Sequence, residues 1–154
     1  MSEHKAHIAW AFAGGDFAKG RYSREHTWRF DGGLTVPASP SPSVVPAPYS
    51  NPAHVDPEEA FVASIASCHM LTFLYVAYKA GFAVDGYEDD AVGVLTKGEN
   101  GVPWISAVTL RPRIRYAGAA PDPAREAQLH EAAHHGCFIS NSVKTVISVV
   151  SPTA

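Results

Sequence analysis

Hydrophobic and polar residues alternate along short segments near the start of the chain, and this period of two predicts half-buried β-strands. Segment 7–12 alternates large apolar residues with small or polar ones, and segment 25–30 runs into the turn sequence Asp31-Gly32-Gly33. A turn of this composition joins antiparallel strands. The N-terminal part is therefore expected to form an antiparallel hairpin or meander.

The same alternation predicts strands in the second half of the chain. Segments 87–96 and 102–116 predict two long strands separated by a glycine-containing turn, and segment 146–150 predicts a last strand. In the second long strand the apolar residues share one face and the arginines share the other. We expect the arginine face to be solvated.

The segment that begins at Asp56 has the start and stop signals of an α-helix. Asp56 is the expected N-cap, Pro57 the first helical residue and Glu59 the second member of a capping box. The helix is expected to run to Gly81, a residue suited to the position after a helix end. Its apolar residues spread round most of the circumference, which predicts a helix buried on nearly all sides.

A second helix is expected from Asp122 through Ala133. The proline-rich segment 37–52 is unsuited to a helix or a central strand and predicts a long extended loop. The order β-β-α-β-β-α-β predicts an α+β fold with two helices against an antiparallel sheet. We interpret residues 1–154 as a single domain.

Composition narrows the class of protein. The 154 residues are 46% hydrophobic, with a formal charge of −3 and a pI near 6.2, which suits one core and gives no basic stripe for nucleic acid. The N-terminus has no apolar signal core, and polar residues interrupt the longest apolar run, 60–77, so no membrane span is expected. We therefore expect a cytoplasmic protein with reduced thiols.

Cys68 and Cys137 are the only cysteines, and both are candidates for redox chemistry. Cys68 lies in the middle of the first predicted helix. Cys137 follows a glycine at the end of the second helix in a polar stretch, which predicts an exposed thiol. The structural alternative is that both are small buried hydrophobic residues.

A reactive cysteine needs a feature that lowers its pKa, because the thiolate is the nucleophile. Cys68 is too far along its helix for the helix dipole to help, so a cation is expected from Lys19, Arg21 or Arg24. Glu58 is either an ordinary first-turn acid or a carboxylate that holds an arginine over the thiolate. Ten helical residues put Glu58 roughly 15 Å from Cys68, so a shared site would need a long arginine or a partner subunit.

Histidines next to the cysteines raise the alternative of a metal site, because His and Cys bind zinc. His69, His134 and His135 flank the two cysteines. Adjacent helical residues point about 100° apart, so Cys68 and His69 are not expected to share a metal. We expect His134 and His135 to form a polar helix end, and we expect no cofactor, because the sequence has no glycine-rich phosphate loop.

Several stretches carry a resemblance to a known family: Asp56-Pro57-Glu58-Glu59-Ala60-Phe61, Ala66-Ser67-Cys68 and His134-His135-Gly136-Cys137-Phe138-Ile139-Ser140-Asn141. With the element order and the spacing of the cysteines, they resemble the OsmC/Ohr family of thiol-dependent hydroperoxide reductases. The second motif, H-x-G-C-x-x-S-N, is the more specific.

The resemblance implies an OsmC-like fold in which antiparallel sheets wrap two long central helices of an intertwined homodimer. It implies a peroxidatic role for Cys68, a resolving role for Cys137 and an arginine-steering role for Glu58. The arginine would be Arg24 or Arg21, or its place could be held by Lys19.

The function implied is reduction of organic hydroperoxides to alcohols. Cys68 would form a sulfenic acid and then a disulfide with Cys137, which an external dithiol such as a lipoylated protein would reduce. Apolar residues are expected to line the site and favour bulky peroxides: Phe61, Ile65, Phe73 and Phe138.

The chain departs from the family pattern in three places. Asp56 stands where the family usually has Asn, the proline-rich segment 37–52 stands where a glycine-rich loop is common, and His69 replaces an apolar or aromatic residue. A non-enzymatic alternative stays open: an OsmC-like dimer that binds a hydrophobic ligand or partner, with structural cysteines.

Overall fold

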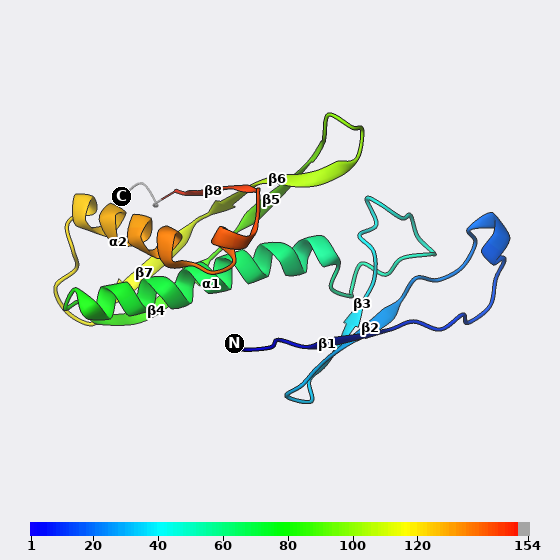
Figure 1. The fold of residues 1–154 in the computed structure, drawn as a ribbon, viewed down its shortest axis with the longest axis horizontal. Helices are drawn as coiled ribbons and strands as arrows, with labels where there is room; N and C mark the ends of the chain where they lie inside the picture. Colours follow the sequence, from blue (N-terminus) through cyan, green and yellow to red (C-terminus); the bar gives the residue numbers. More distant parts are fainter. Residues whose placement is uncertain (151–154) are drawn as a thin grey trace. The chain divides into compact units, whose positions relative to one another are not determined.

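The computed structural model describes residues 1–150. The chain divides into two compact units, Met1–Ala60 and Phe61–Ala154. The first carries a small sheet and the loops after it, and the second carries most of the long helix α1, the second helix α2 and the remaining strands (Figure 1).

The first unit is built on a three-stranded antiparallel meander (Figure 1). Strand β1 (Ala6–Ala9) pairs with β2 (His26–Phe30), which pairs with β3 (Thr35–Ala38). The predicted meander is confirmed. The first strand is shorter than predicted, and all of its residues are exposed rather than half-buried.

The aromatic residues that follow β1 leave the strand and form a cluster of their own. Trp10 packs edge-on against Tyr22 with ring centroids 5.6 Å apart, and Phe17 stacks on Tyr22 at 4.5 Å. The short 3-10 helix η1 (Phe17–Lys19), capped by Asp16, brings Phe17 into this cluster. Aromatic packing therefore replaces the strand pairing predicted for 10–12.

The predicted extended loop begins later than expected, because Pro37 lies inside β3. β2 is the only strand that pairs with β3, and the other side of β3 carries an isolated bridge from Ala38 to Val55, so the missing proline N–H is tolerated at this edge of the sheet. The chain from Ser39 to α1 contains no further helix or strand.

Helix α1 (Pro57–Lys79) starts where the sequence predicts. The Glu59 N–H donates to Asp56 Oδ1 at 2.7 Å, and the Asp56 N–H donates to Glu59 Oε2 at 3.2 Å, which completes a capping box. At the other end Gly81 has φ +84°, and the Phe82 N–H reaches the Ala77 carbonyl at 3.0 Å. This left-handed glycine ends the helix.

Only one stripe of α1 is buried within the single chain, which is less burial than the sequence predicts. The buried residues recur at intervals of four: Ile65, His69, Phe73 and Ala77. On another face Leu71, Tyr75 and Tyr78 are 61%, 59% and 70% exposed. By length and composition alone α1 could also cross a membrane, but the core helix of a soluble protein passes the same test.

Each of the two long predicted strands is broken in two. Strand β4 (Val84–Asp89) pairs with β7 (Pro112–Tyr116), whereas β5 (Val92–Lys97) pairs with β6 (Pro103–Leu110) in a separate sheet. The Arg111 N–H, which lies at the break, donates to Asp89 Oδ1 at 2.7 Å.

The next residue after that break is Pro112, which has no N–H to offer to a ladder. A side-chain acceptor and a proline thus separate the two strand pairs. The predicted solvation of the arginine face is confirmed, since Arg113 and Arg115 are exposed and pair with Glu88, Asp90 and Asp85.

Helix α2 (Pro123–Gly136) runs back beside the second half of α1 (Figure 1). Its predicted N-cap is confirmed: Asp122 Oδ1 accepts from the Arg125 N–H at 2.8 Å. The helix continues past the predicted end at Ala133. After it come the 3-10 helix η2 (Ser140–Ser142) and β8 (Val146–Val149), which pairs in parallel with β6.

Two groups of buried residues form the core of the second unit. One joins α1 to α2 through Phe73, Ala77, Leu129 and Ala133. The other joins α1 to β6 through Ile65, Val108 and Leu110. Two helices packed against largely antiparallel sheets confirm the predicted α+β fold.

Candidate paired-cysteine site

The two cysteines meet where the end of α2 reaches the middle of α1. Cys68 is half-buried and Cys137, the C-cap of α2, is fully buried. Both thiols are free, and their side chains lie close enough for each to shift the pKa of the other. The structure thus brings together two residues far apart in sequence, although the predicted exposure of Cys137 is wrong.

Residues around the second motif hold Cys137 against α1. Gly136 approaches so closely that a Cβ atom there would lie 3.0 Å from Thr72 Cγ2. The Asn141 side-chain amide donates to the carbonyls of His135 and Cys137, both at 2.9 Å. The contact between the two helices requires a small residue at Gly136, and the end of α2 is satisfied by the side-chain amide of Asn141. These two requirements account for the glycine and the asparagine of H-x-G-C-x-x-S-N.

The surroundings of the two sulfurs differ. Burial raises the pKa of Cys68, and its hydrogen bond to Cys137 raises it further, against a smaller opposite effect of the Ile139 and Phe138 N–H groups. Burial also opposes ionisation of Cys137, but hydrogen bonds from Cys68 and Ser140 outweigh it and lower the pKa of Cys137. The Ser140 N–H donates to Cys137 Sγ at 3.4 Å. Within the second unit Cys137 is therefore the more acidic thiol.

Arg24 belongs to the first unit, and its guanidinium rests on its own loop. Nη1 donates to the Tyr22 carbonyl at 3.0 Å and Nη2 to the Gly20 carbonyl at 3.2 Å, with the guanidinium carbon 4.1 Å from the centre of the Tyr22 ring. No carboxylate within residues 1–150 forms an ion pair with Arg24. Its charge is therefore available to another group.

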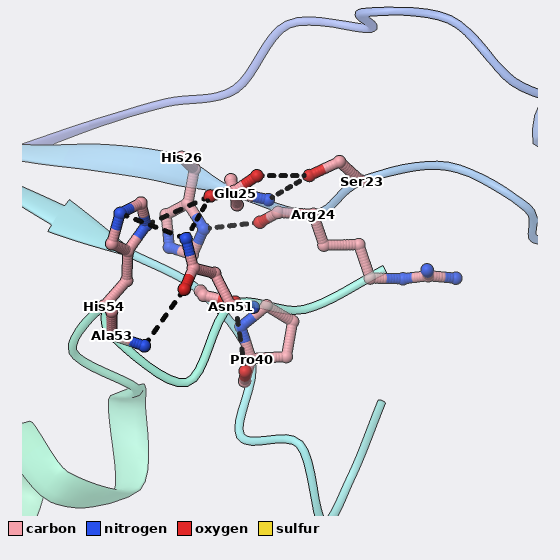
Figure 2. A network of polar contacts seen from close by, with 9 residues as sticks. Ser23, Arg24, Glu25, His26, Pro40, Asn51, Ala53 and His54 are labelled. Carbon is pink, nitrogen blue, oxygen red and sulfur yellow. Dashed lines mark hydrogen bonds and ion pairs between the residues drawn. The ribbon is translucent and has the colours of Figure 1, made fainter. Parts of the chain in front are cut away.

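A polar network fixes the backbone next to Arg24 (Figure 2). Glu25 accepts hydrogen bonds from Asn51 Nδ2 at 2.7 Å and from Ser23 Oγ at 3.1 Å, and it lies 3.4 Å from His54. The Asn51 contact, followed by Ser23 and His54, lowers the pKa of Glu25. The network ties the residue that precedes β2 to the proline-rich loop, and the Arg24 side chain extends away from it (Figure 2).

The other two basic candidates are more exposed. Lys19 pairs with Asp16 at 3.5 Å. Arg21 is exposed, and its backbone closes the loop by bridging to Asp16. All three basic candidates lie in the first unit and both cysteines in the second, so the pairing of a cation with Cys68 stays a prediction.

Glu58 occupies the first turn of α1, as predicted. One of its carboxylate oxygens, Oε2, is shielded from solvent and finds no hydrogen-bond donor within residues 1–150. A shielded carboxylate oxygen without a donor is costly. This oxygen is suited to accept a hydrogen bond from a donor that another conformation of the chain, or another chain, would supply.

The sequence interpretation missed His130, which is 3% exposed and packs against α1. The available signal was the sequence His130-Glu131-Ala132-Ala133-His134, an i, i+4 histidine pair on α2. Such a pair is a known zinc-binding pattern, but His130 Nδ1 is joined to His69 Nε2 at 3.0 Å. Within residues 1–150 no group of three or more potential ligands is placed to hold a metal ion.

The residues predicted to line the site lie in different surroundings, and their role as its lining stays a prediction. Ile65 and Phe73 are fully buried in the two core groups, and Phe138 is 83% exposed. Phe61 does line a pocket of about 410 Å³. The other residues of that pocket are Trp104, Ile105, Ser142, Val143, Lys144 and Thr145.

The fold and the adjoining thiols define an α+β protein with a paired-cysteine site, and comparison with known proteins gives its family. A family model for OsmC-like proteins matches residues 50–151. An OsmC-like protein of unknown function from Vibrio cholerae is 45% identical, with a TM-score of 0.94 over 99% of this chain and 100% of that chain. This chain belongs to the OsmC-like protein family.

Two solved organic hydroperoxide resistance proteins have a similar fold at lower identity. The one from Legionella pneumophila is 17% identical, with a TM-score of 0.72 over 99% of this chain and 98% of that chain. OhrB of Bacillus subtilis is 19% identical, with a TM-score of 0.70 over 98% of each chain. No curated protein shows significant sequence similarity to this chain.

Proposed function

We propose that this chain is a thiol-dependent peroxidase that reduces organic hydroperoxides to alcohols. The observation that carries the proposal is the contact between the free thiols of Cys68 and Cys137. Two free thiols this close are suited to form a disulfide once the sulfurs approach to bonding distance. The fold shared with two organic hydroperoxide resistance proteins supports the same chemistry.

The reaction begins with attack of the Cys68 thiolate on the terminal oxygen of the hydroperoxide. The O–O bond breaks, the alkoxide leaves and takes up a proton as the alcohol, and Cys68 becomes a sulfenic acid. The Cys137 thiolate then attacks the Cys68 sulfur, expels hydroxide, which leaves as water, and forms the disulfide. An external dithiol, of which a lipoylated protein is one example, restores both thiols.

Accessibility and acidity support this division of roles. Cys68 is half-buried and Cys137 fully buried, so a peroxide reaches Cys68 more readily. The lowered pKa of Cys137 favours the thiolate that the second step needs. The raised pKa of Cys68 means that its first step needs a cation from outside the second unit.

Arg24 is the cation that we favour for Cys68, ahead of Arg21 and Lys19. It is half-buried and has no carboxylate partner in residues 1–150, whereas Lys19 is already paired with Asp16. Glu58, with one shielded oxygen lacking a donor, is suited to hold the guanidinium. The same arginine would orient the peroxide.

A homodimer would cover the exposed apolar stripe of α1. Leu71, Tyr75 and Tyr78 lie on one face at helical spacing and are more than half exposed. Tyr75→Glu is expected to yield monomers in light scattering, whereas Val102→Glu, at an exposed apolar residue between β5 and β6, is expected to leave dimers. A monomeric unmodified chain would contradict the dimer.

The substrate would be an alkyl or aryl peroxide rather than hydrogen peroxide. The second unit has an apolar pocket beside Phe61 and Trp104 that is suited to such groups, and neither cysteine is among its lining residues. We further propose a cytoplasmic location, because the cycle depends on a reducing dithiol. The same pocket favours the second candidate function, a non-catalytic protein that binds a hydrophobic ligand.

Peroxide consumption with an excess of a small dithiol tests the proposal. The unmodified protein should consume cumene hydroperoxide faster than hydrogen peroxide, and Cys68→Ser should abolish turnover. Cys137→Ser should allow one turnover at most before overoxidation of Cys68. Arg24→Ala should slow the reaction about tenfold or more, whereas Arg29→Ala, at an exposed β2 residue, should not. Near-normal turnover by Cys68→Ser would refute the role given to Cys68, and no peroxide consumption by the unmodified protein would refute the enzyme and favour ligand binding.

A further inference from the structure

A buried pair of imidazoles joins α1 to α2 next to the cysteines. His69 is fully buried and His130 is 3% exposed. Their rings stack at a centroid distance of 5.3 Å, with His69 Nε2 and His130 Nδ1 3.0 Å apart. Phe73 stacks on the His130 ring, with the two ring centroids 4.4 Å apart.

The pair is placed to set the position of α2 on α1. His69 directly follows Cys68, and His130 lies seven residues before Cys137, about two turns along the same helix. Helix α2 is therefore held to α1 at two levels, by the imidazoles and by the thiols. A helix held at both levels cannot slide or roll without separating the sulfurs.

The bond requires that one ring donates N–H and the other accepts with a lone pair. The remaining ring nitrogens, His69 Nδ1 and His130 Nε2, are shielded and have no partner within residues 1–150. Burial lowers the pKa of both histidines to about 4, and the neighbouring His130 and His134 contribute to the shift of His69. The pair is thus neutral near pH 7.

Few charged groups face the pair. On α2, Glu131 and His134 line the same small pocket as His130, and β8 contributes only the apolar Ile147 and Val149 to it. On β4, Tyr87 packs against Phe73 at 5.8 Å, and burial raises its pKa, so that it stays neutral. A first proton on the pair would add a charge to the core, and a second would break the imidazole bond.

We propose that His69 and His130 are positioning residues whose neutral, hydrogen-bonded pair sets the approach of Cys137 to Cys68. In the proposed peroxidase cycle, on which this inference rests, the pair determines how readily the resolving thiolate reaches the sulfenic acid. The pair does not touch the peroxide.

The test measures the equilibrium constant for the Cys68–Cys137 disulfide in glutathione redox buffers at pH 7. This constant reports how close the two thiols are held, and it does not depend on peroxidase activity. His130→Phe keeps an aromatic ring but removes the hydrogen bond, and should lower the constant about tenfold. His69→Leu removes the same hydrogen bond from the α1 side and should lower the constant by a similar factor.

Two variants serve as controls. His130→Asn keeps a side-chain amide near the position of Nδ1, and His135→Gln changes an exposed histidine of α2 whose ring contacts the Glu131 carbonyl. Both should stay within about twofold of the unmodified chain, because neither removes the contact with His69.

A purely structural role makes a different prediction. It would destabilise the reduced and oxidised proteins equally and leave the disulfide constant unchanged. An unchanged constant in His130→Phe and His69→Leu would therefore overturn the proposal. If the constant falls but the unmodified protein consumes no organic hydroperoxide, the positioning role stands and the peroxidase function fails.

Discussion

Gly136→Ala should weaken the contact between the two helices and slow disulfide formation. The added Cβ would lie 3.0 Å from Thr72 Cγ2, whereas carbon atoms in contact are normally about 3.5–4.0 Å apart. The end of α2 or the Thr72 side chain must then give by a few tenths of an ångström, at a cost of about 1–3 kcal/mol for overpacking. Part of this cost is offset, because alanine favours a helix over glycine by up to about 1 kcal/mol.

The movement falls on the residue next to Cys137, so the sulfur contact should loosen with the helix contact. Thr72→Ser gives a matched second change. It removes the methyl group that the new Cβ would meet and keeps the hydroxyl that donates to the Cys68 carbonyl at 2.9 Å. The double variant should therefore recover both stability and disulfide formation.

The assay compares the unmodified chain, Gly136→Ala, Thr72→Ser and the double variant. Urea unfolding gives the free energy of unfolding of each protein, and equilibration with glutathione gives the stability of its disulfide. The expected interaction between the two changes is about 1 kcal/mol or more in favour of the double variant. Effects that simply add, with no recovery in the double variant, would refute the steric reasoning and with it the role given to Gly136.

Three further predictions concern stability. Asp56→Ala removes the N-cap of α1 and should lower the free energy of unfolding by about 1 kcal/mol, whereas Glu59→Gln, which keeps the capping box, should change it little. Ile65→Ala should cost about 2–5 kcal/mol, because Ile65 is fully buried; a loss below about 1 kcal/mol would contradict its place in the core. Because His69 and His130 have pKa values of about 4 in the folded chain and about 6.5 when unfolded, the unfolded state binds more protons between these values. Stability should therefore fall as the pH falls from about 6.5 to about 4; an equal free energy of unfolding at pH 5 and pH 7 would contradict neutral burial of the pair.

Local signals made the helices predictable. Asp56, Pro57 and Glu59 fix the start of α1 through contacts within one turn, and Gly81 fixes its end through its left-handed backbone. The breaks between β4 and β5 and between β6 and β7 were missed. They depend on the Arg111 N–H meeting Asp89 from another strand, which no short-range pattern contains.

The apolar pattern of α1 also has two different physical causes. Ile65 and Phe73 are apolar because they pack inside the chain, whereas Leu71, Tyr75 and Tyr78 are exposed on it. A hydrophobic pattern does not distinguish burial within a chain from burial against a partner. The helix was therefore predicted to be more buried than it is within the single chain.

The contact between Cys68 and Cys137 depends on how two helices pack, and the sequence suggested it only through resemblance to the OsmC/Ohr family. The burial of Cys137 was missed because glycine and polar neighbours suggested exposure. His130 was missed because its role comes from its contact with His69, 61 residues earlier in the chain. The packing of α2 on α1 determines both contacts, and local sequence patterns carry no signal of that packing.

The central claim is that Cys68 and Cys137 form one redox pair that responds to organic hydroperoxide. The most direct test is intact and peptide mass spectrometry of the reduced protein after one equivalent of cumene hydroperoxide, with hydrogen peroxide in a parallel sample. We predict rapid loss of two hydrogens and a peptide linked through Cys68 and Cys137, formed faster with the organic peroxide. Two thiols that stay free, or a sulfur oxidised without the linkage, would contradict the claim.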